Sequence, residues 1–289
     1  MNKLFRAFLY RIRPFQGFLF IKMWSFVFFI DFKSYESRNQ IAKEKLNEFA
    51  DTCAAAFSFR FIDTEDRPYR FRSLLGIPVY SYSFDAEASL TDERNNLIPC
   101  FLFTHWKETG VNNYDEYCAK LSSINEMPST NSVIWRGAVT NIARQKLLEL
   151  DENELFDFKS IHWAGPSNSK RYPKNFLTLE EQVKRARFLI DVEGAGYSAR
   201  SKLLMHCPRV LLIQEQRFRE YWFTQLEPWK HFVPISKDFS DLKEIVHRLL
   251  NDPELERYIL ANQMEFAKQY LTSTSADEVW KTILKGGTQ

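Results

Sequence analysis

The stretch Phe188-Leu-Ile-Asp-Val-Glu-Gly-Ala-Gly-Tyr-Ser-Ala-Arg-Ser-Lys202 decides the fold. It opens with a continuous apolar run of strand length at residues 188–192 and passes through a short glycine loop at 194–197. A segment with helical character follows, at residues 198–207. An apolar strand that leads through a glycine turn into a helix is typical of a parallel sheet covered by helices on both faces. The stretch therefore predicts a doubly wound α/β domain.

The same alternation extends on both sides of this stretch. Strands are expected at residues 132–135, 158–163, 210–214 and 232–235, and helices at 141–150, 178–187, 241–250, 253–271 and 275–284. Thr178-Leu-Glu-Glu181 is a capping box at the start of one helix, and Asp252-Pro253 is a cap with proline at the first helical position of another. The second half of the chain thus has the clearer pattern.

The first half of the sequence also predicts α/β structure, but from shorter apolar runs. A helix is expected at residues 34–57, followed by strand-sized apolar runs at 57–62, 77–82 and 99–103. The polar segment 125–132, which contains Pro128, is the best candidate for a domain boundary.

Composition restricts the class of protein. The 289 residues are 45% apolar and 26% charged, as in a soluble globular protein, and the net charge of +2 gives no reason to expect a nucleic acid partner. The four cysteines and five histidines are scattered without the spacing of metal ligands. We therefore expect no metal site, and reduced thiols in a cytosolic compartment.

The amino-terminal 30 residues are basic and rich in aromatic side chains. They contain five basic residues and no acidic one, and their apolar run, 15–30, is interrupted by Lys22. This run is shorter than the about 20 residues that a membrane-spanning helix needs, and no cleavage site of small residues follows it closely. Two interpretations remain open: a first strand and helix of the core, or a basic segment that lies on an anionic membrane surface.

Two predicted strand ends carry unusual chemistry, and ligands of doubly wound domains bind at such ends. At one, Gly194 and Gly196 allow backbone amides to approach a ligand, Ser198 is expected to cap a helix whose amino end attracts anions, and Arg200 follows. At the other, Trp135-Arg136-Gly137 leads into a helix that carries Arg144. Two arginines from neighbouring strand ends could hold a pyrophosphate. The alternative is a simple tight turn beside an ordinary salt-bridged arginine.

Several segments, in this order, resemble glycosyltransferase family 90, which includes protein O-glucosyltransferases, fungal capsule xylosyltransferases and bacterial lipopolysaccharide-synthesis proteins of the LpsA type. They are residues 62–68 (IDTEDRP), 77–83 (IPVYSYS), 132–137 (SVIWRG) with Arg144, 193–203, and 225–235 (QLEPWKHFVPI). The resemblance implies a GT-B-like fold, in which two Rossmann-like domains face a central cleft and carboxy-terminal helices pack back. It also implies an acceptor-side domain at residues 1–128 and a nucleotide-sugar-binding domain at 129–289.

The resemblance also implies roles for individual residues. Arg136 and Arg200 are similar to the arginines that hold the donor diphosphate, and Asp66 falls on the aspartate that acts as the base. The sequence departs from the family pattern around Asp66, with Glu65 and Arg67 beside it, so that Asp63 and Glu65 stay open as alternatives. The other residues expected to bind the donor, from the two strand ends described above, are Gly137, Thr140, Gly194, Ala195, Gly196, Tyr197 and Ser198.

The resulting hypothesis is an inverting, metal-independent glycosyltransferase without a cofactor. It would move a hexose or pentose from a UDP-sugar to a saccharide or lipid-linked glycan in lipopolysaccharide or surface glycan synthesis. We expect it in the cytoplasm or on the inner face of a membrane, with residues 1–30 as the candidate membrane contact. The alternative is a non-catalytic protein that binds sugar nucleotides or glycans and descends from such a transferase.

Overall fold

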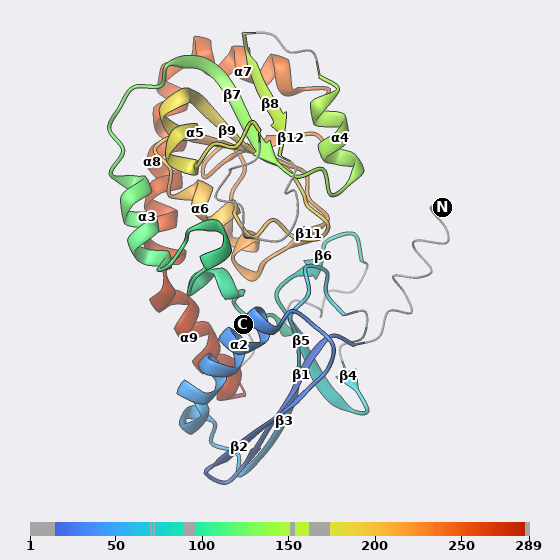
Figure 1. The fold of residues 1–289 in the computed structure, drawn as a ribbon. Coiled ribbons are helices and arrows are strands. Elements are labelled where there is room, and N and C mark those ends of the chain that lie inside the picture. Colours follow the sequence, from blue (N-terminus) through green and yellow to red (C-terminus); the bar gives the residue numbers. More distant parts are fainter. Residues whose placement is uncertain are drawn as a thin grey trace. The chain divides into compact units, whose positions relative to one another are not determined.

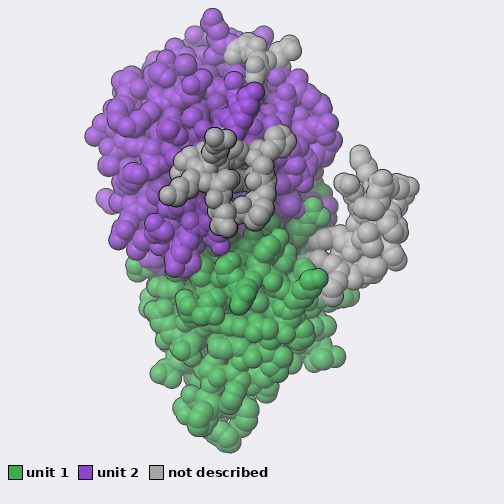
Figure 2. All heavy atoms as spheres, viewed as in Figure 1, with its two compact units in different colours: residues 1–104, 219–221, 274–289 green, residues 105–218, 222–273 purple. Residues whose placement is uncertain are grey.

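The computed structural model describes residues 15–69, 71, 73–88, 96–150, 154–161 and 174–286. The chain forms two compact units, shown in different colours in Figure 2. Unit 1 comprises residues 1–104, 219–221 and 274–289, and unit 2 comprises 105–218 and 222–273. The predicted domain boundary after residue 128 stays a prediction.

Unit 2 contains a five-stranded parallel sheet (Figure 1). Its strands, in the order in which they lie side by side, are β12 (Val233–Ile235), β10 (Val210–Gln214), β9 (Ala186–Asp191), β7 (Thr130–Gly137) and β8 (Phe156–Ser160). The first strand along the chain, β7, lies between the second and the third. This order makes the chain change direction across the sheet between β7 and β9. The predicted parallel α/β sheet is confirmed.

Both faces of this sheet are buried. On one face, alternate strand residues such as Val133 and Ile190 form one apolar core with Leu147 of α4 (Ile142–Leu148), Leu249 of α7 (Leu242–Asn251) and Ile259 of α8 (Pro253–Tyr270). The intervening strand residues Ile134, Leu189 and Leu211, on the other face, are also buried. Gln263 of α8 accepts a hydrogen bond from the backbone of β10. The other helices of unit 2 are α3 (Tyr114–Ser122), α5 (Leu179–Arg185) and α6 (Ser201–Met205), with two short 3₁₀ turns, η4 (Lys107–Thr109) and η5 (Tyr221–Gln225, whose first residue belongs to unit 1).

The predicted caps are present, but one predicted helix starts later. Thr178 and Glu181 form the capping box of α5, and Asp252 caps α8. The helix expected at residues 198–207 begins only at Ser201, because the Ser198 hydroxyl donates to Asp191 and caps no helix. The expected cap by Ser198 is therefore wrong: α6 has five residues and its N-cap is Arg200. The anion site expected at this helix end stays a prediction.

Unit 1 is also α/β, but its sheet differs from a Rossmann sheet. The strand order is β2 (Phe26–Asp31), β1 (Gly17–Met23), β3 (Phe57–Asp63), β5 (Ile77–Ser81) and β4 (Ser73–Leu74). Only β3 and β5 pair in parallel, and β1 is antiparallel to both of its neighbours. The cause is local: residues 15–30 form a hairpin that turns at Trp24, whose φ is 52°, in place of the strand and helix considered from sequence.

Helix α2 (Glu36–Glu48) covers one face of this sheet. Its Lys43 ammonium lies over the rings of Phe18 and Phe29, and its Leu46 is fully buried. Helix α9 (Ser273–Leu284), of which residues 274–284 belong to unit 1, accepts two hydrogen bonds from Arg60 at its last carbonyls. The strand expected at residues 99–103 is wrong, since η3 (Phe101–Phe103) is a 3₁₀ turn. The remaining short elements are η1 (Ala50–Thr52), β6 (Phe84–Asp85) and β11 (Phe218–Arg219).

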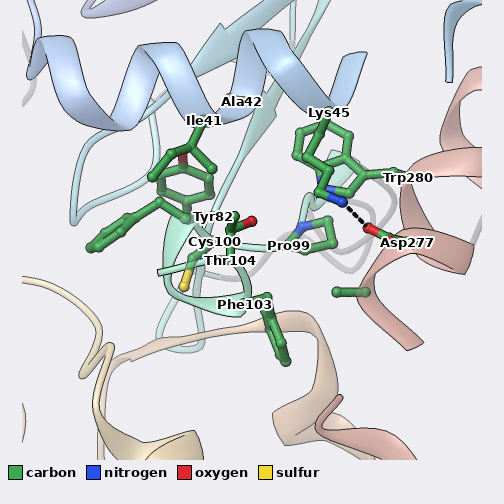
Figure 3. Close-up of a pocket in the computed structure, with 12 residues that line it drawn as sticks. Ile41, Ala42, Lys45, Tyr82, Pro99, Cys100, Phe103, Thr104, Asp277 and Trp280 are labelled. Carbon is green, nitrogen blue, oxygen red and sulfur yellow. Dashed lines mark ion pairs between the residues drawn. The ribbon is translucent and has the colours of Figure 1, made fainter. Parts of the chain in front are cut away.

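A small pocket of about 270 Å³ lies among α2, residues 99–104 and α9 (Figure 3). Its lining is mostly apolar, and Lys45 pairs with Asp277 at 2.8 Å on its wall. None of the predicted site residues lines it. We therefore regard it as part of the packing of unit 1.

The predicted membrane contact is only partly described. The basic residues Lys3, Arg6, Arg11 and Arg13 lie outside the described residues, whereas the hairpin that follows them is described. Among the helices in the described ranges, none combines the length and the hydropathy that crossing a bilayer requires.

Candidate active site

The carboxyl ends of β7 and β9 define the candidate donor site. These strands are neighbours, and the sheet order reverses between them. In open parallel sheets, ligands bind outside the carboxyl ends at such a switch point. Both chemically unusual strand ends identified from sequence, Trp135-Arg136-Gly137 and the loop 193–200, fall at this place.

Two arginines lie on the ring of Trp135. The guanidinium carbon of Arg144 is 5.6 Å from the ring centroid, and that of Arg200 is 5.8 Å from it. Both distances suit a cation–π contact. Trp135 itself is fully buried. An indole ring thus supports two positive charges at the switch point.

Gly137 is required by this arrangement. A Cβ atom at residue 137 would lie 2.6 Å from Cζ2 of Trp135. No real Cβ approaches a ring atom that closely, so a side chain at residue 137 would force the buried ring out of its position. In Trp135-Arg136-Gly137, therefore, the tryptophan is the platform and the glycine leaves space for it.

Arg200 carries a charge that is largely removed from water. Its Nη1 donates to the carbonyl of Arg136, and its Nε lies 3.5 Å from Oδ1 of Asp191. Burial lowers the pKa of Arg200 below its ordinary value, while Asp191 acts in the opposite direction. The guanidinium stays protonated, and an anionic ligand would offset the cost of its desolvation.

The side chain of Arg136 is directed to β8. It is buried, its Nη2 pairs with Oδ1 of Asp157 at 2.7 Å, and its Nη1 donates to the carbonyls of Trp135 and Asp157. Burial raises the pKa of Asp157, but its pairs with Arg136 and Arg185 outweigh burial and hold that pKa below the ordinary value. Of the two predicted arginines, the structure brings Arg200 to the Trp135 ring together with Arg144, while Arg136 contributes its carbonyl.

Asp191 holds the glycine loop in place. Its fully buried carboxylate accepts hydrogen bonds from Ser198 (2.7 Å), Ser201 (2.6 Å) and Gln216 (2.7 Å). Because these hydrogen bonds occupy its carboxylate, we assign Asp191 a structural role. Within the described ranges, no group of three or more histidine, cysteine or acidic side chains could hold a metal ion.

Asn141, which the sequence marked only as the start of a helix, connects the two loops. Its amide donates to the carbonyls of Glu193 (2.9 Å) and Gly194 (2.7 Å), and its Oδ1 caps α4 by accepting from the Arg144 backbone. A Cβ atom at Gly194 would lie 3.2 Å from Nη2 of Arg144, so the loop and this guanidinium fit closely. Asn141 therefore holds the two loops of the site together.

The other predicted donor residues follow the same loops. Thr140 is exposed and accepts from Nη1 of Arg144 at 3.2 Å. Ala195 is exposed, whereas Gly196 and Tyr197 are buried. Ala195 is thus more exposed than the other residues of this loop.

The predicted base lies in unit 1, in the bend that follows β3. The carboxylate of Asp66 accepts a hydrogen bond from Nη1 of Arg38 at 2.7 Å, and the Asp66 side chain is 36% exposed. Asp63 is fully buried and accepts from Ser81, and Glu65 accepts from Ser34 at 3.5 Å. Burial thus argues against Asp63 as a base. Arg38, on α2, was not predicted, since nothing in the sequence connects it with Asp66.

An arginine pair beside a glycine loop, at the switch point of a parallel sheet, defines an α/β protein with a candidate ligand site at the carboxyl edge of that sheet. The chain belongs to the glycosyl transferase family 90, whose family model matches residues 60–286. This confirms the resemblance stated above.

The similar proteins have low sequence identity to this chain. The O-glucosyltransferase LpsA of Dichelobacter nodosus is 26% identical over 157 residues, which cover 53% of this chain and 48% of that protein. The O-glucosyltransferase rumi of Drosophila melanogaster is 24% identical over 78% of this chain and 58% of that protein. Human protein O-glucosyltransferase 1 is 22% identical over 72% and 56%, respectively. The chain thus spans about half the length of these relatives.

Proposed function

We propose that the protein is an inverting glycosyltransferase that transfers a hexose or pentose from a UDP-sugar to a hydroxyl group of a saccharide acceptor. The observation that carries the proposal is the pair of guanidinium groups, Arg144 and Arg200, on the Trp135 ring at the switch point of the parallel sheet. Positive charge held there suits the diphosphate of a sugar nucleotide.

The chemistry needs three contributions from the chain. The acceptor oxygen forms a bond to the anomeric carbon while the bond from that carbon to the diphosphate oxygen breaks. The acceptor's proton passes to a carboxylate, for which we propose Asp66. The charge that develops on the leaving diphosphate is stabilised by Arg144, Arg200 and the amides of the loop at Gly194, Ala195 and Gly196. A single displacement of this kind inverts the anomeric centre.

The remaining predicted residues support this donor site. Arg136 anchors the end of β7 to Asp157 and offers its carbonyl to Arg200, so we propose that it positions Arg200. Ser198 holds the loop to Asp191, and Gly137 admits the Trp135 ring. Thr140 and Tyr197 complete the proposed donor set.

For the acceptor we propose a saccharide or lipid-linked glycan of lipopolysaccharide or surface glycan synthesis, modified on the cytoplasmic side of the membrane. The relative named LpsA favours a surface glycan, and the relatives' common name, O-glucosyltransferase, favours glucose among the possible donor sugars. We propose no metal and no cofactor.

The proposal is tested with Arg144→Ala and Arg200→Ala. Each variant should lose about 10²–10³-fold in kcat/KM with a UDP-sugar, as expected for removal of one charge-stabilising donor. The matched control is Arg257→Ala, because Arg257 is an exposed residue of α8 whose ion pair is with Glu254 on the same helix. Full activity in both site variants would show that the arginine pair holds no diphosphate.

A further inference from the structure

The sheet of unit 1 is apolar on both faces, but α2 covers only one of them. On the covered face, Phe18 and Phe20 of β1 are fully buried. On the opposite face, the register places Met23 beside Phe26 and Phe57, and Ile21 beside Phe28 and Phe59. Strands β2, β1 and β3 therefore present three adjoining rows of large apolar side chains.

This open aromatic face, as we call it, is unusually exposed. Its residues and their exposed fractions are Met23 36%, Trp24 62%, Phe26 63%, Phe28 50%, Ile30 50%, Phe57 51% and Phe59 43%. Trp24, at the hairpin turn, contacts the ring of Phe57 at 4.9 Å between centroids. The five aromatic rings alone expose on the order of 500 Å², which is close to the largest apolar patch that soluble monomers usually leave to water. The patch therefore indicates a partner.

Charge indicates which partner. The open aromatic face contains no charged side chain, and the first 30 residues hold five basic residues and no acid. The next residue, Asp31, is paired with Lys43 at 2.6 Å, and Lys33 is exposed just beyond it. Within the hairpin, Lys22 is buried and donates to the carbonyls of Cys53 and Ala55, whereas the sequence that precedes the hairpin, residues 1–14, carries four basic residues and no acid. An aromatic sheet face that follows such a basic sequence suits a surface that is negative at its headgroups and apolar beneath them.

Area favours a bilayer over a second copy of the chain. A stable protein interface buries about 800 Å² on each partner, more than the open aromatic face offers. β2 is an edge strand, and its unpaired backbone groups must stay in contact with water or lipid headgroups. Insertion of the side chains is therefore shallow.

We propose that the open aromatic face inserts into the interface of a bilayer that contains anionic lipid. This goes beyond the proposed function, because it requires neither donor binding nor transfer. It assigns membrane contact to a sheet face that includes Phe57 and Phe59 of β3, outside the amino-terminal segment.

The test is sedimentation of the full chain with vesicles, comparing phosphatidylcholine alone with phosphatidylcholine that contains phosphatidylglycerol. The wild type should bind the anionic vesicles, and Phe26→Ser/Phe28→Ser should bind them at least about tenfold more weakly, since the insertion of each ring contributes more than a factor of ten when complete. Tyr258→Ser is the matched control, because Tyr258 is an equally exposed aromatic side chain (51%) on α8 of unit 2.

Folding is checked by thermal melting, which the double substitution should leave unchanged because both side chains are half exposed. Equal binding of the double variant and the wild type would overturn the proposal. The proposal would also be overturned if the wild type were a dimer without lipid and the double variant were a monomer, because the open aromatic face would then join two copies of the chain. Binding that is equally strong to neutral vesicles would refute the part assigned to anionic lipid.

Discussion

At the scale of single residues, Gly137 offers the most direct test of the donor site. In Gly137→Ala the new methyl group would lie 2.6 Å from Cζ2 of Trp135, whose ring supports Arg144 and Arg200. We expect the ring to shift, at a cost of about 1–3 kcal/mol of stability, and UDP affinity to fall at least about tenfold. Denaturant unfolding and titration calorimetry measure the two effects.

The control for this substitution is Gly76→Ala in unit 1. Gly76 has a φ of 77°, and a Cβ atom at residue 76 would meet nothing within 4 Å, so alanine introduces backbone strain without a collision. Gly76→Ala should lower stability and leave UDP affinity unchanged. If Gly137→Ala binds UDP as tightly as the wild type, the Trp135 platform has no part in binding.

At the scale of elements, the end of α6 contains a group that responds to pH. His206 is its C-cap, and its Nε2 makes a 2.8 Å hydrogen bond with the carbonyl of Leu271, just beyond α8. Burial lowers the pKa of His206. The unfolded chain then binds a proton at a higher pH than the folded chain does. The resulting stability is fully present above the ordinary histidine pKa of about 6.5 and is lost as the pH falls through the folded value.

The expected result is that the free energy of unfolding rises between about pH 5 and pH 7.5, and that His206→Gln reduces this rise. His247→Gln is the control, because His247 is an exposed residue of α7 in the same unit. Urea unfolding at a series of pH values measures both variants. A rise that is the same in His206→Gln as in the wild type would assign the pH dependence to other groups.

The elements also show what the sequence could predict. Local signals located α5, α7 and α8, because the capping groups of α5 and α8 bond only within their own first turn. The late start of α6 could not be predicted, since it depends on Asp191 taking the Ser198 hydroxyl. The role of Arg144 could be suspected from the sequence, because a cation in the first helical turn after a strand-end loop is unusual. The pairing of Arg136 with Asp157 could not be predicted, because it depends on the register of β7 and β8. The hairpin of residues 15–30 could not be predicted from the sequence, because both of its faces are apolar.

At the scale of the whole molecule, the chain combines a doubly wound unit that carries the arginine pair with a mixed-sheet unit that carries Asp66. This division predicts that donor binding and proton abstraction can be separated by mutation. UDP at 100 times its dissociation constant should stabilise the protein by about 2.7 kcal/mol, measured as a thermal shift. Asp66→Asn should keep that shift, because none of the contacts of Asp66 is with the arginine pair.

Transfer should respond in the opposite way. Asp66→Asn should lower kcat by about 10²–10⁴-fold through loss of the base, with little loss of stability, because a half-exposed ion pair such as that with Arg38 contributes only about 0–1 kcal/mol. Glu65→Gln is the matched control, since it neutralises the neighbouring carboxylate. If Glu65→Gln loses transfer and Asp66→Asn does not, Glu65 is the base. A wild type that binds UDP but transfers no sugar to a broad set of glycan acceptors would instead be a binding protein derived from a transferase.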